Sequence, residues 1–371
     1  MNIGLLAAQR TSGGGVAFRR HLTAALAAHD DVDRLVVFGD PSAGGTGDAV
    51  IGVGASDLGP FAAMLEEVVA LPRLVRRHRV DVLICPGSSV PPRLPVPRIF
   101  WPLTVAPIDD HGRAMFADRT GWARRWLMRR LLGASCRRAD AVIFSSRFAR
   151  DLYAGFADLD HTPDVVIHPA GTVPTASHRA GRMPWGNSPH ALMVSHLYRY
   201  KMVGEAIDGF ADFIARTGAP HVLVIAGNAT DASYFTDLRQ RVATAGLNDR
   251  VHLLGAVPSS ELAALYSSAS VFIFSSACEN AGSYAVVDAL AHGLPIVCSN
   301  LSSTPEIVGD AALMYDPRNP GELSHRLEQL ATSEALETQL RALARTRAES
   351  LPSWQEIADA VVRFARRGLS G

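Results

Sequence analysis

Lysine is almost absent from this sequence: of its 36 lysines and arginines, only Lys201 is a lysine. Cysteine is scarce too, since four cysteines stand far apart and show neither a CxxC motif nor the Cys/His spacing of a zinc site. We therefore exclude a disulfide framework and expect a reducing, cytoplasmic compartment.

No apolar run approaches the ~20 residues that cross a bilayer, and the first residues, MNIGLLAAQ, lack the basic leader of a signal peptide. We expect a cytoplasmic protein that is neither exported nor integral to a membrane.

An excess of positive charge is missing as well. The 36 basic residues balance 36 acidic ones, whereas binding to nucleic acid through counterion release needs a basic excess. Nucleic acid is therefore not an expected partner.

The chain does have 48% hydrophobic residues over 371 positions, which is typical of a globular protein with two domains. This chain otherwise uses arginine wherever it has a basic side chain, so the lone Lys201 indicates a position that needs the point charge and flexible stem of a lysine. The alternative is that this lysine occurs by chance.

Short apolar runs alternate with helical patterns along the chain, as in parallel sheets built from βαβ units. Predicted strands lie at 2–8, 34–38, 81–85, 98–102, 140–144 and 164–168, and again at 191–195, 221–226, 250–254, 270–274, 294–298 and 312–315. A stretch with three Gly and three Pro separates the two halves. We predict an N-terminal Rossmann-like domain over 1–170, a linker over 171–189, a C-terminal Rossmann-like domain over 190–350 and a last helical segment over 351–371.

Ligands of open α/β sheets bind beyond the carboxyl ends of the strands, so the polar strand-to-helix junctions of the second half are candidate sites. The first junction is SHLYRYK, where His196, Arg199 and Lys201 can converge on an anion near a helix N-terminus. Surface charges on a loop are the alternative. A third junction, residues 302–310, combines hydroxyls and acids, and we interpret it as a helix cap. The alternative is that its side chains line the cleft.

The second junction, SSACENAGSY, follows a buried strand and opens a helix. Gly282 and Ser283 at the helix start form an anion nest, next to Tyr284. Two carboxylates bracket this nest, so we expect phosphates on the backbone N–H groups and ligand hydroxyls on Glu279 and Asp288. The alternative is that Glu279 caps the helix and Asp288 belongs to its solvated face.

The second half resembles the group 1 (family 4) glycosyltransferases of the GT-B fold, in which two Rossmann-like domains face a cleft. The segments that carry the resemblance are VIHPAGT, MVSHLYRYK, VLVIAG, DRVHLLGAVPSSELAALYSSASVFIFSSACENAGSYAVVDALAHGLPIVCSN and TPEIVGDAALMYDP. It implies an enzyme that binds a nucleotide-diphosphate sugar in its C-terminal domain and transfers the sugar to an acceptor hydroxyl with retention. It implies neither a metal ion nor a cofactor.

The resemblance also implies roles for single residues. Lys201 matches the lysine that holds the donor diphosphate, while His196 stands where the family has an arginine, and Arg199 is expected to supply that guanidinium. Glu279 matches the first of two family glutamates and is expected to act in catalysis with Lys201 and Arg199. The second glutamate is replaced by Asp288, one residue farther along, which is expected to hold the ribose. Gly282, Ser283 and Tyr284 complete the expected donor site.

The first half matches the family less well. Gly14 and Gly15, in a cluster of three glycines after the first strand, resemble the turn that lies beneath the donor phosphates, and a simple turn is the alternative. The family places a histidine after a middle strand of this domain, but none stands in the matching stretch 100–107. His111, preceded by Asp109 and Asp110, follows that stretch, and we interpret it as a surface residue; a position facing the cleft is the alternative.

The segment Arg113–Arg138 contains eight arginines and a single acid, Asp118. Within it, Leu127 and Leu131 form a stripe that predicts a helix packed on the sheet, with Arg125 and Arg129 ~200° away around the helix. This interpretation explains most of the pattern. The other is a basic surface for peripheral contact with anionic lipid or with a phosphorylated acceptor.

Two alternative functions share a two-domain α/β architecture. One is a sugar-nucleotide epimerase, and the other is a binding protein of periplasmic type, which would need an export signal. The resemblance around Lys201 and Glu279 favours transfer to an acceptor that the sequence does not identify: a glycan, a glycolipid or a small molecule. In the family, the last helix returns to the N-terminal domain, and the helical spacing of Ile357, Val361 and Val362 predicts that this helix buries one face.

Overall fold

The computed structural model describes residues 1–7, 14–39, 49–52, 60–116, 121–171, 184–229, 231–280 and 283–369. The chain divides into two compact units. The first unit contains Met1–Ile108, Asp118–Ala170 and Pro352–Gly371, and the second contains Asp109–Ala117 and Gly171–Leu351. Most of the predicted linker, 172–183, lies outside the described residues. The assignment of 109–117 to the second unit was not predicted from the sequence.

The first unit is built on a parallel seven-stranded sheet in the order β3-β2-β1-β4-β5-β6-β7. Its strands are β1 (Asn2–Ala7), β2 (Arg34–Gly39), β3 (Ala49–Ile51), β4 (Val82–Gly87), β5 (Arg98–Pro102), β6 (Ala141–Phe144) and β7 (Asp164–Val166). Strand β3 was missed from the sequence because three residues are too few to show a period of two. The helices are α1 (Gly14–Ala27), α2 (Pro60–Arg77), α3 (Gly121–Arg138), α4 (Arg147–Phe156) and α12 (Trp354–Leu369).

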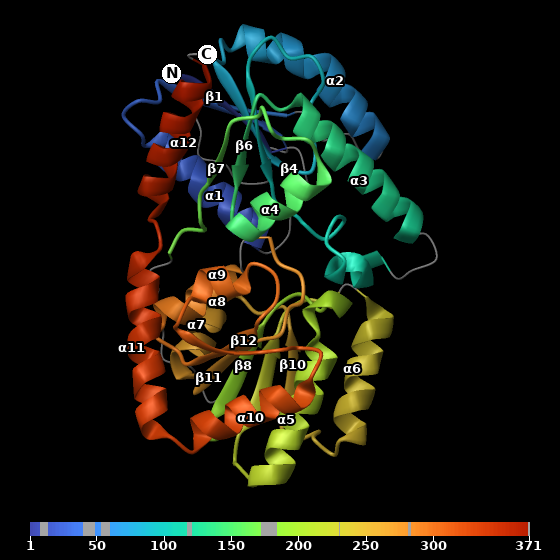
Figure 1. Ribbon diagram of the computed structural model, residues 1–371, viewed down its shortest axis with the longest axis vertical. Coiled ribbons are helices and arrows are strands. Elements are labelled where there is room, and N and C mark those ends of the chain that lie inside the picture. The colour runs from blue at the N-terminus through green and yellow to red at the C-terminus, as the bar shows by residue number, and fades with distance from the viewer. Residues whose placement is uncertain are drawn as a thin grey trace. The chain divides into compact units, whose positions relative to one another are not determined.

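The last helix, α12, packs beside the first, α1, as the red and blue helices of Figure 1 show. Trp354 lies at the start of α12, with its ring 5.9 Å from that of Phe18 and stacked at 5.4 Å on His21. Ile357 and Val361 are fully buried. The sequence prediction that the last helix returns to the N-terminal domain is therefore confirmed.

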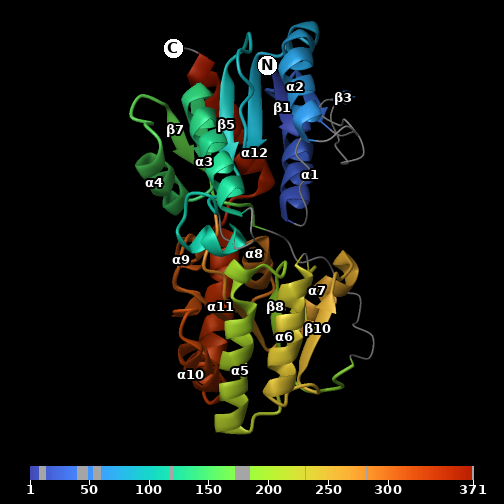
Figure 2. The ribbon, with the colours of Figure 1, turned by 90° about the vertical axis from the view of Figure 1, so that its right-hand side faces the viewer.

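Helix α3 is turned differently from the prediction. Its buried residues include Leu132 and Cys136, whereas Leu127, one of the two leucines of the predicted stripe, is exposed. Instead, Arg125 lies on the inward side and donates from Nε to the carbonyl oxygen of Pro107 over 3.0 Å. The helix follows the sheet along its length in Figure 2.

The second unit is built on a parallel six-stranded sheet in the order β10-β9-β8-β11-β12-β13. Its strands are β8 (His190–Val194), β9 (Val222–Ala226), β10 (Val251–Gly255), β11 (Val271–Phe274), β12 (Ile296–Ser299) and β13 (Ala312–Tyr315). Its α-helices are α5 (Val203–Thr217), α6 (Ala232–Thr244), α7 (Ser259–Ser268), α8 (Tyr284–Ala291), α9 (Thr304–Val308), α10 (Pro320–Ala331) and α11 (Glu334–Ser350). The described part of this unit also contains two 3-10 helices, η2 (His111–Phe116) and η3 (Arg199–Lys201).

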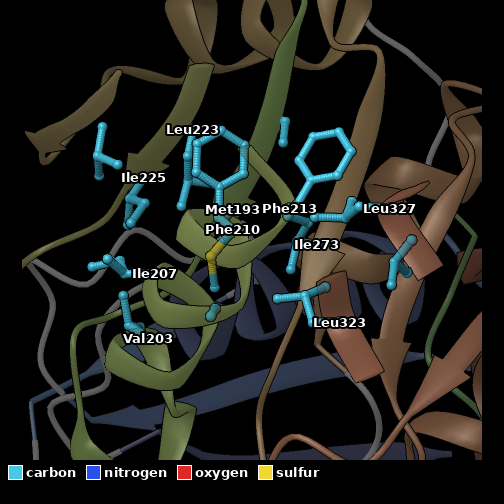
Figure 3. Packing of buried hydrophobic residues seen from close by; sticks show 14 of the residues in the cluster. Met193, Val203, Ile207, Phe210, Phe213, Leu223, Ile225, Ile273, Leu323 and Leu327 are labelled. Atoms are coloured by element: carbon cyan, nitrogen blue, oxygen red, sulfur yellow. The ribbon is translucent and has the colours of Figure 1, made fainter. Parts of the chain in front are cut away.

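Successive side chains of each central strand point to opposite faces of this sheet. Met193 packs into one buried cluster with the side chains of α5 and α10, shown in Figure 3, while its neighbour Leu192 packs into another cluster with α8. Two apolar faces explain why the strands read as continuous hydrophobic runs, which are typical of a parallel sheet covered on both sides. The predicted architecture of two doubly wound Rossmann-like domains is confirmed.

The chain reverses direction across this sheet at β8 and β11. From β8 the chain continues to β9 and β10 on one side, and it returns to β11 on the other. Such a switch point leaves a crevice beyond the carboxyl ends of the two strands. The loops that follow β8 and β11 are the first and second junctions of the sequence analysis.

Candidate functional site

The loop after β8 leads through η3 into α5. A Cβ at Gly227 would lie 1.8 Å from the carbonyl oxygen of Ser195, so only glycine allows the end of β9 to approach this loop so closely. Met202 follows η3 in the left-handed conformation, with φ 50°. A non-glycine residue in this region is strained, and strain of this kind is typical of functional loops.

Two hydrogen bonds join the loops after β8 and β11. The hydroxyl of Ser275 donates to the carbonyl oxygen of Lys201 over 2.6 Å, and the N–H of Ala277 donates to the carbonyl oxygen of Tyr200 over 2.9 Å. A small crevice lies between the strand ends, lined by side chains that include Lys201 and Ser276. The two predicted junctions therefore form one continuous structure.

Lys201 and Glu279 form an ion pair at the centre of this structure. The ammonium Nζ of Lys201 donates to Oε1 of Glu279, and the two side chains are only 11% and 12% exposed. The same ammonium lies 5.1 Å from the ring centroid of Tyr200 and 5.6 Å from that of Phe274. The structure thus brings together two of the predicted catalytic residues in a largely desolvated place, where charge interactions are strong.

The main chain of Glu279 is held by the third junction. Its N–H donates to Oγ of Ser302 over 2.6 Å, and its carbonyl oxygen accepts from Ser302 and Ser303 at 2.7 and 3.1 Å. The interpretation of this junction as a helix cap was wrong, because Ser303 occupies the N-cap position of α9 without a side-chain capping bond. The two hydroxyls fix the backbone of Glu279 instead.

Helix α8 carries the other predicted donor-binding residues. Ser283 is its N-cap and accepts from the N–H of Ala285 over 3.2 Å, so Glu279 does not fill that position. Gly282 lies outside the described residues. Burial raises the pKa of Tyr284, and the charge of Asp288 raises it further. Asp288 is half-buried rather than part of a solvated face.

His196 is a neutral imidazole. Burial lowers its pKa, and the charge of Lys201 lowers it further, so the ring carries no charge at neutral pH. Its Nδ1 is buried and has no hydrogen-bond partner in the described part of the chain. His196 therefore does not supply, at neutral pH, the positive charge of the arginine that it replaces.

Arg199 contacts α6. Its guanidinium donates to Oδ2 of Asp237 over 3.1 Å and lies 4.9 Å from the ring centroid of Tyr234. A second carboxylate, that of Asp231, lies 3.7 Å away. The side chain is 38% exposed, so these contacts leave it accessible, and its predicted contact with a diphosphate stays a prediction.

Asp109 is the residue that sequence reasoning missed. It is only 5% exposed and belongs to the second unit, although it precedes Lys201 by 92 positions in the chain. Burial raises the pKa of the Cys278 thiol, and Asp109, which accepts a hydrogen bond from that thiol, raises it further. Oδ1 of Asp109 also accepts from the backbone N–H of His111 over 2.9 Å, and Nδ1 of His111 lies 3.2 Å away. Segment 109–113 thus packs against the residue next to Glu279.

The glycine turn belongs to the first unit. Gly14 and Gly15 are the first two residues of α1, and Gly13 lies outside the described residues. Among the described residues, no group of three or more His, Cys, Asp or Glu side chains could hold a metal ion. A larger depression of about 400 Å³ lies between α6 and the edge strand β10, with Arg239 as the charged residue of its lining.

Residues 182–347 match the family described as glycosyl transferases group 1, and this range includes Lys201, Glu279 and Asp288. The O-antigen chain mannosyltransferase B of Escherichia coli is 41% identical over 81 residues, which cover 22% of this chain and 21% of that protein. The matched part is therefore about a fifth of the length of this relative. The resemblance stated from the sequence is confirmed for this part of the chain.

Solved structures are similar over the whole chain. Sucrose-phosphate synthase from Thermosynechococcus elongatus is similar with a TM-score of 0.77 and 19% identity, covering 100% of this chain and 99% of that one. Anabaena Alr3699/HepE in complex with UDP-glucose is similar with a TM-score of 0.73 and 15% identity, covering 99% of this chain and 100% of that one. The GT-B fold predicted from the sequence is confirmed.

Proposed function

We propose that this chain, whose residues 182–347 match group 1 glycosyltransferases, transfers a sugar from a nucleotide-diphosphate sugar to an acceptor hydroxyl. The observation that carries the proposal is the buried pair of Lys201 and Glu279 at the switch point of the second sheet. Nucleotides bind at this place in doubly wound sheets. The similarity to a structure that holds UDP-glucose supports a nucleotide-sugar donor.

In this proposal Lys201 stabilises the leaving diphosphate. An ammonium has three N–H donors, and Glu279 is the only described side chain that accepts one from Lys201. The remaining donors can reach phosphate oxygens, on which negative charge grows as the glycosidic bond breaks. Glu279 keeps the ammonium in place and presents its second oxygen to a sugar hydroxyl.

The other predicted donor contacts follow from α8. The helix N-terminus, capped by Ser283, favours a phosphate, and the half-buried carboxylate of Asp288 accepts from the ribose hydroxyls. Hydrogen bonds to a charged group contribute roughly 1.5–3 kcal/mol each. Asp288→Ala should therefore weaken donor binding, while Asp288→Glu tests whether a longer side chain serves as well from the same position.

Retention of the anomeric configuration, independence of metal ions and the absence of a cofactor are part of the proposal. They are supported by the family resemblance around Lys201 and Glu279. We also include a cytoplasmic location and a peripheral contact with a membrane through segment Arg113–Arg138. In the described part of the chain, no helix has the length and apolar character needed to cross a bilayer.

The proposal is tested by incubating the protein with glucose and mannose linked to UDP, GDP or dTDP and measuring free nucleoside diphosphate. Slow release from one donor, with a rise in the unfolding temperature at saturating donor, is expected. The matched control is the double variant Lys201→Met/Glu279→Gln, which removes both charges together and should bind donor more weakly and release little diphosphate. Inversion of the sugar without release would instead assign the epimerase alternative. The absence of both binding and release with every donor would overturn the proposal.

A further inference from the structure

Helix α3 presents large apolar side chains to solvent. Trp122 is 75% exposed, Trp126 55% and Leu127 52%. Among the described residues only two other large hydrophobic side chains are exposed, Val69 and Leu254, and each stands apart from this helix in the chain. Single exposed apolar residues are ordinary, but three within six positions of one helix form a patch.

The inward side of the same helix is occupied by arginine. Arg125 and Arg129 both donate to the carbonyl oxygen of Pro107, at 3.0 and 3.3 Å. The guanidinium of Arg129 also lies 4.9 Å from the ring centroid of Phe156. This first part of α3 therefore reverses the usual orientation of an amphipathic helix, because cations face the protein while indole rings face outward.

The charge of the patch is of one sign. Helix α3 contains six arginines and no acidic residue. Arg130 lies beside the patch, with its guanidinium 5.1 Å from the ring centroid of Trp126. An exposed indole flanked by arginine fits the interface of a bilayer, where the ring enters the headgroup region and the cation meets lipid phosphates.

We propose that Trp122, Trp126 and Leu127, the outward patch of α3, insert into the surface of a bilayer that contains anionic lipid. This inference deepens the peripheral contact included in the proposed function and names its residues. A membrane explains the patch better than a protein partner does, because a membrane accepts a wholly basic helix without requiring matched carboxylates. Both tryptophans are mostly exposed, so replacing them removes little packing within the protein.

The test is co-sedimentation of the full chain with vesicles of phosphatidylcholine alone and with vesicles of equal parts phosphatidylcholine and phosphatidylglycerol. The wild-type protein should bind the anionic vesicles more strongly, and its binding should weaken as salt is raised. Trp122→Ala/Trp126→Ala should lower the partition coefficient for anionic vesicles at least tenfold. Val69→Ala and Leu254→Ala, which also remove an exposed apolar side chain, should leave the partition coefficient unchanged.

Two further measurements keep the outcomes distinct. Thermal unfolding should show that the double tryptophan variant is as stable as the wild type, and donor hydrolysis should continue at the wild-type rate. Vesicle binding that survives in this variant, or that is absent in the wild type, would overturn the membrane proposal without affecting the proposed transfer. Concentration-dependent self-association that is lost in the variant would assign the patch to a protein contact instead.

Discussion

At the scale of single residues, the pair of Lys201 and Glu279 determines how the site can be probed. Both side chains are nearly buried, so replacing one leaves the other as an uncompensated charge. Breaking a buried pair in this way typically costs about 3–5 kcal/mol. A loss of activity in a single variant would therefore mix a catalytic effect with a loss of stability.

We predict that Lys201→Met lowers the rate of sugar transfer by roughly 10²–10³, because it removes a preorganised positive charge from the leaving group. It should also lower the free energy of unfolding. Adding Glu279→Gln should restore most of the stability but not the rate. Urea unfolding and single-turnover assays of the three proteins separate the two effects, and a single variant with a nearly normal rate would contradict the role of Lys201.

A second prediction concerns Asp109. Asp109→Ala should destabilise the second unit by roughly 1–3 kcal/mol, because it leaves buried donors without their acceptor. Asp110→Ala is the matched control, since the neighbouring carboxylate is 81% exposed and should contribute little. Hydrogen exchange of residues 190–350 is the measurement. If residues 190–350 were equally protected from hydrogen exchange in Asp109→Ala and Asp110→Ala, Asp109 would not stabilise the second unit.

The residues of the site could be predicted from the sequence only where a local signal existed. Lys201 stood out because no other lysine occurs in the chain, and Glu279 because small residues surround it after a buried strand. Asp109 carried no such signal. Its contact with Cys278 joins positions 169 apart, and no local pattern records a contact of that kind.

At the scale of elements, the loop after β12 holds the loop after β11 in place through hydrogen bonds. Ser302 has φ 62° and exchanges two hydrogen bonds with the main chain of Glu279. Ser302→Ala should therefore lower the rate of transfer more than the affinity for donor, because Glu279 would be less well positioned. Ser267→Ala is the control, since that exposed hydroxyl also bonds to a carbonyl oxygen, but within α7. Equal kinetics of the two variants would exclude a positioning role for Ser302.

Most strands were predicted to within two residues, because buried strands leave a clear pattern of apolar residues in the sequence. Strands β5 and β13 have the predicted bounds. For α3, the helical spacing of apolar residues predicted the wrong inward side. It suggested that Leu127 and Leu131 face the protein, but Arg125 and Arg129 occupy that side. Arginine can bury its stem and still bond to a carbonyl oxygen, so polarity alone did not identify the inward face.

At the scale of the whole molecule, α12 belongs to the first unit although it follows the second in the chain. Ile357→Ala should destabilise the protein by about 2–5 kcal/mol, because a fully buried side chain is lost from α12, the helix that packs on α1. The loss should be confined to the first unit. Hydrogen exchange should show faster opening of β1 and β2, while residues 190–350 stay protected. Arg363→Ala, on the exposed side of α12, should change neither unit, and a uniform loss of protection would mean that the units unfold together.

The assignment of chain segments to units has a consequence for synthesis on the ribosome. Residues 109–117 leave the ribosome before any other part of the second unit, and the first unit lacks α12 until the second unit has been synthesised. From position 117 to position 351, translation at about 5–20 residues per second takes about 10–50 s. During that time the apolar side of α1 that α12 covers is open to solvent or to a chaperone. The final packing of the first unit must therefore follow synthesis of the second unit.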